Sequence, residues 1–478
     1  MQFIHYASIA KNNIITMSQS NWNRRSVLKS LGLAAVGVPL AGKAIEAETS
    51  EINSLPLFKK DKKKLDKPVT AIVCGAGGRG WLAYSSYALK YPDELQIVGV
   101  AEPIPYRRER MAKAFNIPEE NQFVTWEHVF EKPKFADAII ITTPDDLHYG
   151  PAMAGLNLGY DLLLEKAIAQ SWSECNDILK LAEKKEAIVA VCHVLRYTSY
   201  FRKIKEVIDS GEIGNVVSVQ HLEPIGRIHM AHSFVRGNWG NSKKSNPIIL
   251  SKSCHDTDIL RWLVGKPSTK VSSMGSLSVF RKENAPDGST ARCTDGCGVE
   301  RQCPYSAIKI YKDERGWLHH LQLEEVNDNT ITRELKNGPY GRCVYRCDND
   351  VVDHQITNFE FEGGITVAFS MEAHSHYGGR RTRIFCTNGD MIGDEHTLTI
   401  TNSLTGKQEV WDASKANNNG SGHGGGDHGL VHDFVRAVSF QDPTLLTSTI
   451  QASMESHLMG FMAEESRLDN GTVREIKL

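Results

Sequence analysis

Three glycines with the spacing Gly-x-Gly-x-x-Gly, at Gly75, Gly77 and Gly80, lie between a run of β-forming residues and a helical stretch. In such a turn the first glycine permits the tight bend, the second lets the backbone approach a pyrophosphate, and the third lets the helix pack on the strand. Arg79 lies within the same turn, and the N-terminus of the helix offers unpaired N–H groups to phosphate oxygens. The spacing predicts a dinucleotide-binding turn, although a glycine-rich turn without a ligand has the same pattern.

An acidic residue is expected about 20 residues beyond such a turn, where it accepts hydrogen bonds from ribose hydroxyls. Glu102 stands there, at the end of a second strand predicted for residues 95–101. Its charge would repel a 2′-phosphate, so NAD is favoured over NADP. Arg107 and Arg108 follow closely enough to leave NADP open.

Two further predicted strands also end in polar residues. The strands, at 138–142 and 160–164, alternate with helical stretches, which predicts a parallel, doubly wound α/β sheet. Ligands of such sheets bind beyond the carboxyl ends of the strands. The polar residues that follow these strands are therefore expected in the same crevice as Glu102: Thr143, Pro144, Asp145, His148, Glu165 and Lys166.

Taken together, these motifs resemble those of the Gfo/Idh/MocA oxidoreductases. The resemblance rests on the glycine turn, the Thr-Pro-x-x-x-His segment at 143–148, the Glu-Lys pair at 165–166 and the segment 255–263. It covers roughly residues 66–478.

The resemblance implies two domains and, with them, a fold and a cofactor. An NAD-binding Rossmann domain is expected at 68–192, and a second α+β domain with a large open, mostly antiparallel sheet at 193–478. The second domain would bind substrate and form a homo-oligomer. Strand-like runs at 216–221, 356–361 and 365–371 agree with it.

In that family the lysine of a Glu-Lys-Pro motif lines the nicotinamide and substrate pocket, which assigns this place to Lys166, although Ala167 replaces the proline. Oxidising a secondary alcohol requires a base for the hydroxyl proton and a cation near the oxygen, while hydride leaves to the nicotinamide. His255 and Lys166 suit these roles. His255 precedes a predicted helix, whose dipole favours a neutral, proton-accepting ring. A histidine that only caps this helix, and a surface lysine, are the alternatives.

The surroundings of His255 depart from the family pattern. Many members carry an aspartate four residues earlier, where this chain has Ser251. Lys252 or Asp258 would then have to orient the ring. Tyr197 is a further candidate for a catalytic role.

Several polar and aromatic residues of the second half are candidates for binding carbohydrate. Hydrogen-bond donors beside an aromatic surface suit the hydroxyls and the apolar face of a sugar. One candidate, His423, lies in the glycine-rich loop 422–428, which could approach a ligand or simply connect two elements. Each residue alone can equally be structural. The candidates are Arg196, His229, His232, Arg236, Asn238, Trp239, Asp258 and His423.

Five of the ten cysteines crowd into two short segments of a predicted insertion at 293–347. A structural zinc ion, disulfides, an iron–sulfur centre and free thiols stay open as explanations, because the spacings match no common pattern. With a metal or with bridges, the two segments would form one structural unit. The residues are Cys293, Cys297, Cys303, Cys343 and Cys347.

Residues 1–47 are typical of a secretory signal. Arg24 and Arg25 precede an apolar run at 31–41, which is shorter than the roughly 20 residues needed to cross a bilayer. The arginine pair resembles the twin-arginine signal, which exports folded proteins. Met17 is an alternative start, and residues 48–67 form a Lys-rich linker. We therefore expect a periplasmic protein without a stable membrane anchor.

The composition indicates the class of partner. With 478 residues, 41% of them apolar and 23% charged, the chain is globular and large enough for more than one domain. A formal net charge of −2 provides no global basic field for nucleic acid or anionic lipid. This charge balance fits a small neutral carbohydrate better than it fits a polyanionic partner.

Three functions follow as hypotheses. The first is an exported NAD-dependent oxidoreductase that oxidises a secondary hydroxyl of a sugar or glycoside. The second is an NAD-dependent glycosidase or lyase, which oxidises the sugar transiently, eliminates the leaving group and returns the hydride, as some relatives do. The third is a non-catalytic protein that binds sugar or NAD, and the presence of both Lys166 and His255 argues against it.

Overall fold

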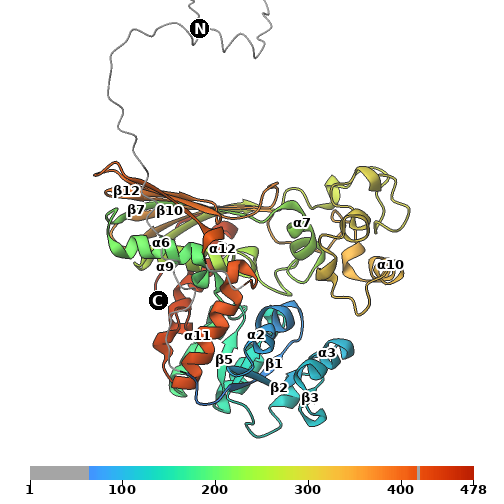
Figure 1. Ribbon diagram of the computed structural model, residues 1–478. Coiled ribbons are helices and arrows are strands. Elements are labelled where there is room, and N and C mark those ends of the chain that lie inside the picture. Colours follow the sequence, from blue (N-terminus) through green and yellow to red (C-terminus); the bar gives the residue numbers. More distant parts are fainter. Residues whose placement is uncertain (1–63, 417–419) are drawn as a thin grey trace, which may run out of the picture. The chain divides into compact units, whose positions relative to one another are not determined.

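The computed structural model describes residues 64–416 and 420–478, all within the compact unit formed by residues 54–478. The predicted signal segment and the predicted linker up to residue 63 lie outside the described residues. The described chain contains two sheets and the helices that pack on them (Figure 1).

The first sheet is parallel, with six strands in the order β3-β2-β1-β4-β5-β6. Side chains of β1 alternate between two apolar cores, so that Ala71 and Val73 enter one core while Ile72 and Cys74 enter the other. Such two-sided burial is typical of a sheet with helices on both faces. The strands are β1 (Val69–Cys74), β2 (Leu95–Ala101), β3 (Gln122–Phe123), β4 (Ala138–Ile141), β5 (Asp161–Leu164) and β6 (Val189–Val191).

Helices cover the two faces of this sheet, which confirms the predicted doubly wound α/β fold. A helical segment at Gly78–Ser85 leads into α2 (Ser86–Lys90), and α2 and α3 (Pro105–Phe115) contribute to the same core as Ala71. On the other face, α4 (Tyr149–Asn157) and α5 (Trp172–Lys184) contribute to the core of Ile72.

The second sheet has nine strands in the order β14-β13-β12-β11-β7-β10-β9-β8-β15. Only β7 and β10 pair in parallel, and every other neighbouring pair is antiparallel, as the resemblance implied. The strands are β7 (Val216–Pro224), β8 (Ser268–Ser276), β9 (His354–Phe361), β10 (Ile365–Glu372), β11 (Arg381–Cys386), β12 (Gly389–Gly393), β13 (Thr397–Asn402), β14 (Gln408–Asp412) and β15 (Arg474–Glu475).

Helices cover one face of this sheet. On β7 the side chains of Val219 and His221 are buried, while that of Gln220 between them is exposed, which is the alternation of a strand with one solvated face. The buried face packs against α6 (Ser199–Ser210), α9 (Cys254–Val264) and α12 (Ile450–Leu468) (Figure 1). None of the described helices is both long and apolar enough to cross a membrane.

The C-terminal part of the chain returns to the first sheet. Helix α11 (Gly426–Phe440) places Leu430, Val431 and Phe434 in the core beside β1. The backbone N–H of Val191, in β6, donates to the carbonyl of Ser448 at 2.8 Å. Residues 193–478, which were predicted to form the second domain, therefore also contribute to the nucleotide-binding domain.

A segment between β8 and β9, residues 277–353, forms what we call the insertion. It contains the predicted Cys-rich stretch and helix α10 (Asp328–Asn337). Its small apolar core is separate from those of the two sheets and includes Ile310, Tyr311, Leu321, Ile331 and Leu335. The insertion is therefore a packed substructure with its own core.

Candidate functional site

The glycine turn follows β1 and has the geometry that a pyrophosphate requires. Gly75 has a φ of +94°, and a Cβ on Gly80 would lie 2.0 Å from the Gly75 carbonyl oxygen. Both positions therefore exclude larger residues. A Cβ on Gly77, in contrast, would meet only Arg107 Nη1 at 4.0 Å, so packing within the chain does not explain this glycine. An open approach to the backbone here fits a bound pyrophosphate.

Glu102 lies at the end of β2, against this turn. Its buried carboxylate accepts hydrogen bonds from the backbone N–H groups of Ala76 at 2.7 Å and Ile104 at 3.0 Å. Glu102 thus stands beside the glycine turn, where a ribose is expected.

Arg79 bridges two buried carboxylates. Its Nε lies 2.5 Å from Glu165 Oε1, and its Nη2 lies 3.0 Å from Asp427 Oδ1. Tyr84 also donates its hydroxyl hydrogen to Glu165, at 2.6 Å. Burial alone would raise the pKa of Glu165, but Arg79 and Lys166 hold that pKa below its ordinary value. The predicted cofactor residue Arg79 therefore also holds the strand end that precedes Lys166.

Lys166 is held through both its backbone and its side chain. Its backbone N–H donates to Glu165 Oε2 at 2.9 Å, and its Nζ donates to the carbonyl of Ser251. The Lys166–Ala167 peptide bond is cis. His148 stands behind this turn, with Nδ1 2.7 Å from the Ala167 carbonyl oxygen.

His148 also joins this turn to the polar segment after β4. Its Nε2 lies 3.0 Å from the carbonyl oxygen of Thr143, the residue before Pro144. The predicted Thr-Pro-x-x-x-His segment therefore packs directly against the Lys166 turn.

His255 lies in the first turn of α9 and is buried, with no hydrogen-bond partner for Nδ1. Burial lowers its pKa well below the ordinary 6.5, and the positive charge of Lys166 and the rings of His423 and His193 lower it further. The structure therefore brings Lys166 and His255 together, and the ring is neutral at neutral pH. A titration near 6.5, the ordinary value for histidine, does not apply here.

Two more imidazoles that the sequence did not single out continue from His255: His193 lies beside it, and His457 lies beside His193. The ring centroid of His193 lies 6.1 Å from that of His255 and 5.4 Å from that of His457. His193 lies two residues beyond the end of β6, so the parallel-sheet rule could have indicated it. His457 accepts a hydrogen bond from Ile168 N at 3.0 Å, and no local pattern predicts it.

His423, in the loop before α11, also lies beside His255. Its ring centroid lies 5.9 Å from that of His255, and its Nδ1 lies 3.0 Å from Asp427 Oδ1. The predicted candidate is thus linked both to the proposed base and to the Arg79 network.

Arg196 and Asp258 do not face a substrate. They form a buried bidentate pair, with Arg196 Nε and Nη2 2.7 and 2.6 Å from the two oxygens of Asp258. Arg196 follows β6 and Asp258 lies on α9, so the pair fixes the helix of His255 to the first sheet. Both residues are positioning residues instead of sugar ligands.

The hydroxyl of Tyr197 also has its hydrogen-bond partners within the chain. It is fully buried, and its hydroxyl bonds to Ser448 Oγ at 3.0 Å while it accepts the N–H groups of Thr447 and Ser448 at 3.2 Å. Burial raises its pKa. We therefore do not retain Tyr197 as a catalytic residue.

Asp145 and Trp239 bind each other across the two halves. Trp239 Nε1 donates to Asp145 Oδ1 at 2.9 Å, and Ser245 and Asn246 donate to Oδ2 at 3.1 Å. The Asp145 carboxylate and the indole N–H are engaged with each other instead of with a ligand.

Two of the predicted sugar ligands anchor the insertion instead. His232 stacks on Tyr340, with ring centroids 4.4 Å apart, and its Nδ1 lies 2.7 Å from the Tyr311 hydroxyl. Arg236 donates to the carbonyl oxygens of Arg342 at 2.7 Å and Tyr305 at 2.6 Å.

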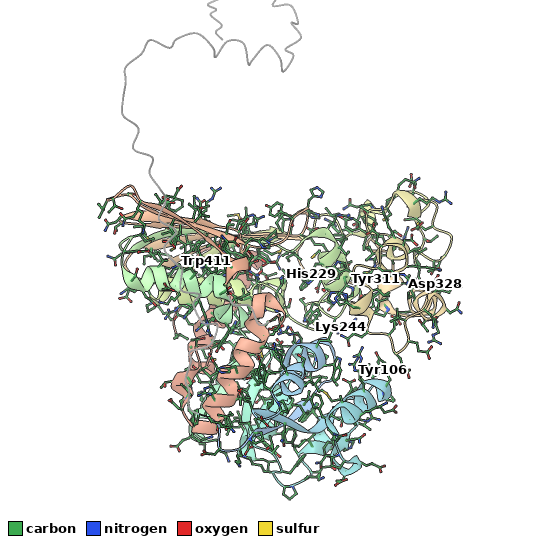
Figure 2. All side chains as sticks on the ribbon, viewed as in Figure 1. Tyr106, His229, Lys244, Tyr311, Asp328 and Trp411 are labelled. Carbon is green, nitrogen blue, oxygen red and sulfur yellow. The ribbon has the colours of Figure 1, made fainter. Side chains whose placement is uncertain are left out.

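His229 stays a candidate for substrate contact. Its pKa is lowered well below 6.5, first by burial and then by Lys252, with a smaller contribution from Lys166. Its ring centroid lies 5.2 Å from that of Trp317, which belongs to the insertion. Figure 2 shows His229 where the insertion joins the rest of the chain.

The five clustered cysteines gather at the base of the insertion. Four of them line one small cavity together with Arg236, and the Sγ of Cys347 donates to the carbonyl of Cys343 at 3.3 Å. All ten cysteines are free. Within residues 64–416 and 420–478, no group of three or more His, Cys, Asp or Glu residues is arranged to hold a metal ion. The described residues thus support neither bridges nor zinc, and zinc stays a prediction from sequence. The four are Cys293, Cys297, Cys303 and Cys343.

Comparison with known families gives two matches. Residues 69–193 match the oxidoreductase family with an NAD-binding Rossmann fold, GFO_IDH_MocA. Residues 205–466 match the C-terminal alpha/beta domain of the same oxidoreductase family.

Individual relatives agree with these matches. YteT of Bacillus subtilis is 24% identical over 386 residues, covering 76% of this chain and 87% of YteT. The scyllo-inositol 2-dehydrogenase (NAD⁺) of the same bacterium is 26% identical over 213 residues, covering 45% of this chain and 59% of the relative. An inositol dehydrogenase homologue from Azotobacter vinelandii, solved with NADH and myo-inositol, shares the fold with a TM-score of 0.61 at 14% identity, covering 86% of this chain and 99% of that one.

The buried Arg196–Asp258 pair generates a stability prediction. Asp258→Asn should lower the free energy of unfolding by about 3–5 kcal/mol, because it leaves a buried guanidinium without its counter-charge. Asp209→Asn is the matched control, since Asp209 pairs with Lys205 at the surface of α6 and should cost at most about 0.5 kcal/mol. Urea denaturation of both variants measures the difference, and equal small losses would contradict the structural role of the pair.

Proposed function

The chain belongs to the Gfo/Idh/MocA oxidoreductases, and we propose that it oxidises a secondary hydroxyl group of a sugar or glycoside by hydride transfer to bound NAD. The observation that carries the proposal is the meeting of Lys166 with a neutral, buried His255 at the carboxyl edge of the first sheet. A cation and a proton acceptor at one place are what alcohol oxidation requires.

The residues present fit a dinucleotide. Gly75, Gly77 and Gly80 would receive the pyrophosphate, and Glu102 would accept from the ribose hydroxyls. Bound NAD supplies the hydride acceptor. The carboxylate of Glu102, buried at the turn, favours NAD over NADP because it would repel a 2′-phosphate.

The chain's own residues then move one proton and stabilise one charge. A neutral His255 accepts the hydroxyl proton on its imidazole. Lys166, held by the Ser251 carbonyl, stabilises the negative charge that builds on the substrate oxygen. His423 and His229 stand beside these two groups and are proposed to contact the sugar.

We further propose that the protein is exported to the periplasm and assembles as a homo-oligomer. Support for export is the arginine pair Arg24–Arg25 before the apolar run 31–41. Support for assembly is the uncovered face of the nine-stranded sheet, where the side chains of Met274 and Ile356 are 63% and 58% exposed.

The mechanism predicts the behaviour of two variants. His255→Ala should lower the rate of hydride transfer by about 10²–10⁴-fold while NAD affinity survives. Lys166→Met should be similarly harmful, and the two losses should not add because both residues serve one proton transfer. Single-turnover NAD reduction with a panel of polyols and glycosides measures these rates.

The matched control is His396→Ala, which removes an exposed histidine. A folded His255→Ala protein that reduces NAD at the wild-type rate would overturn the mechanism. Glycosidic cleavage without net NADH would instead favour the elimination hypothesis.

The same site predicts a pH profile. Protonated His255 cannot accept a proton, so the rate should fall on the acid side. Because the pKa of His255 lies well below 6.5, this fall should occur well below pH 6.5, and the rate should be flat through neutral pH. In Lys166→Met the residual rate should fall at a higher pH, since the charge that lowers the His255 pKa is gone. An acid limb near pH 6.5 in the wild-type protein would contradict this environment.

Glu102 generates a prediction on cofactor choice. Glu102→Ala should weaken NAD binding by roughly 1–3 kcal/mol, through lost charge-assisted hydrogen bonds to the ribose, and should weaken NADP binding less. Glu102→Gln removes the charge and keeps one of the two oxygens that accept from Ala76 and Ile104. Fluorescence titration with NADH and NADPH measures both, and an unchanged NADH affinity in folded variants would remove Glu102 from the site.

A further inference from the structure

The insertion returns to the nucleotide-binding turn. Tyr106, on α3, donates its hydroxyl hydrogen to the backbone carbonyl of Gln322. A Cβ placed on Gly78 would lie 2.8 Å from Gln322 Nε2. Figure 2 shows Tyr106 on the side of α3 that faces the insertion. Residues more than 200 positions apart thus meet at the N-terminus of the helix expected to receive phosphate.

An electrostatic effect of α3 on the insertion agrees with this approach. Burial raises the pKa of the Tyr340 hydroxyl, and Arg107, on α3, partly opposes the rise through its positive charge. Tyr340 belongs to the insertion and stacks on His232. The charge of Arg107 thus acts on the insertion at Tyr340, and the direct contact with α3 is that of Gln322.

Gln322 is held in place by the insertion and not by the turn it faces. It directly follows the short helix Leu318–Leu321, whose Leu318 and Leu321 belong to the insertion core. Gln322 itself has a φ of +49°, the left-handed region that side chains rarely adopt. The position of this carboxamide is therefore set by packing.

The carboxamide of Gln322 has no partner for its oxygen. Oε1 is buried and makes no hydrogen bond within the described chain. Leaving such a group unpaired costs about 1–3 kcal/mol. A carboxamide beside Gly78 can donate to phosphate oxygens through Nε2 and accept from a ribose hydroxyl through Oε1, and the second of these bonds would remove this cost.

The other end of the insertion is fixed to the substrate half. Arg236 binds the carbonyls of Arg342 and Tyr305, and His232 binds Tyr311. These bonds, with the one that Arg342 Nη2 donates to the carbonyl of Arg236 at 2.7 Å, anchor this end, whereas the end at α3 is joined by the Tyr106–Gln322 bond. Separating the insertion from α3 therefore breaks fewer interactions than separating it from the substrate half.

We propose that the insertion clamps the dinucleotide, with the carboxamide of Gln322 binding the pyrophosphate opposite the glycine turn. This rests on the proposed function, because it needs NAD in that turn. The clamp retains the cofactor, and NAD leaves only after the Tyr106–Gln322 contact opens.

The clamp is tested by the release of bound NADH. Gln322→Ala should release NADH about 10–100-fold faster, as expected for the loss of a hydrogen bond to a charged group. Tyr106→Phe keeps the carboxamide of Gln322 but removes the hydrogen bond to the Gln322 backbone carbonyl. This variant should release NADH faster than wild type, by a smaller factor than Gln322→Ala. Stopped-flow fluorescence after mixing with excess NAD⁺ measures release. Gln302→Ala, an exposed glutamine of the same insertion, is the matched control and should match wild type.

Fragment binding separates a pyrophosphate contact from general loosening. Gln322→Ala should weaken ADP by about 10-fold or more and leave adenosine unchanged. Equal weakening of both fragments, or NADH release at the wild-type rate in Gln322→Ala, would overturn the clamp. A wild-type protein that binds no NADH would instead refute the proposed function.

Discussion

The site depends on one cation, Arg79, shared between two buried carboxylates. The side chains of Glu165 and Asp427 are only 6% and 3% exposed, so each would be costly to bury without a counter-charge. Because Arg79 sits within the glycine turn, the three residues tie together the start of the nucleotide site, the end of β5 and the first turn of α11. None of these elements can move alone without leaving a buried charge unpaired.

The electrostatics of catalysis follow from that constraint. Glu165 precedes Lys166 and receives its backbone N–H, and Asp427 holds His423. Lys166 and the ring of His423 both add to burial in lowering the pKa of the His255 ring. A neutral base beside a lysine is thus a product of the fold as a whole. The helix dipole alone does not account for it.

The sequence predicted what local patterns determine. The glycine turn, Glu102 and the Glu165–Lys166 pair follow strands, and parallel strands bring their carboxyl ends to one edge, so their meeting required no knowledge of side-chain packing. Pairing between distant segments was not predicted. A buried arginine such as Arg196 has the same residue type as a sugar ligand, and only the position of Asp258, 62 residues away, distinguishes the two. The contact of Gln322 with the glycine turn was missed for the same reason.

The central claim is that Lys166 and His255 face the reacting carbon between the nucleotide and the substrate. A crystal structure of the protein with NADH and a bound polyol tests it most directly. The account predicts that one substrate hydroxyl lies within hydrogen-bond distance, about 3 Å, of both Lys166 Nζ and the His255 ring, with the nicotinamide beside the same carbon. A substrate whose hydroxyls contact neither residue, or a nicotinamide outside the carboxyl edge of the first sheet, would contradict it.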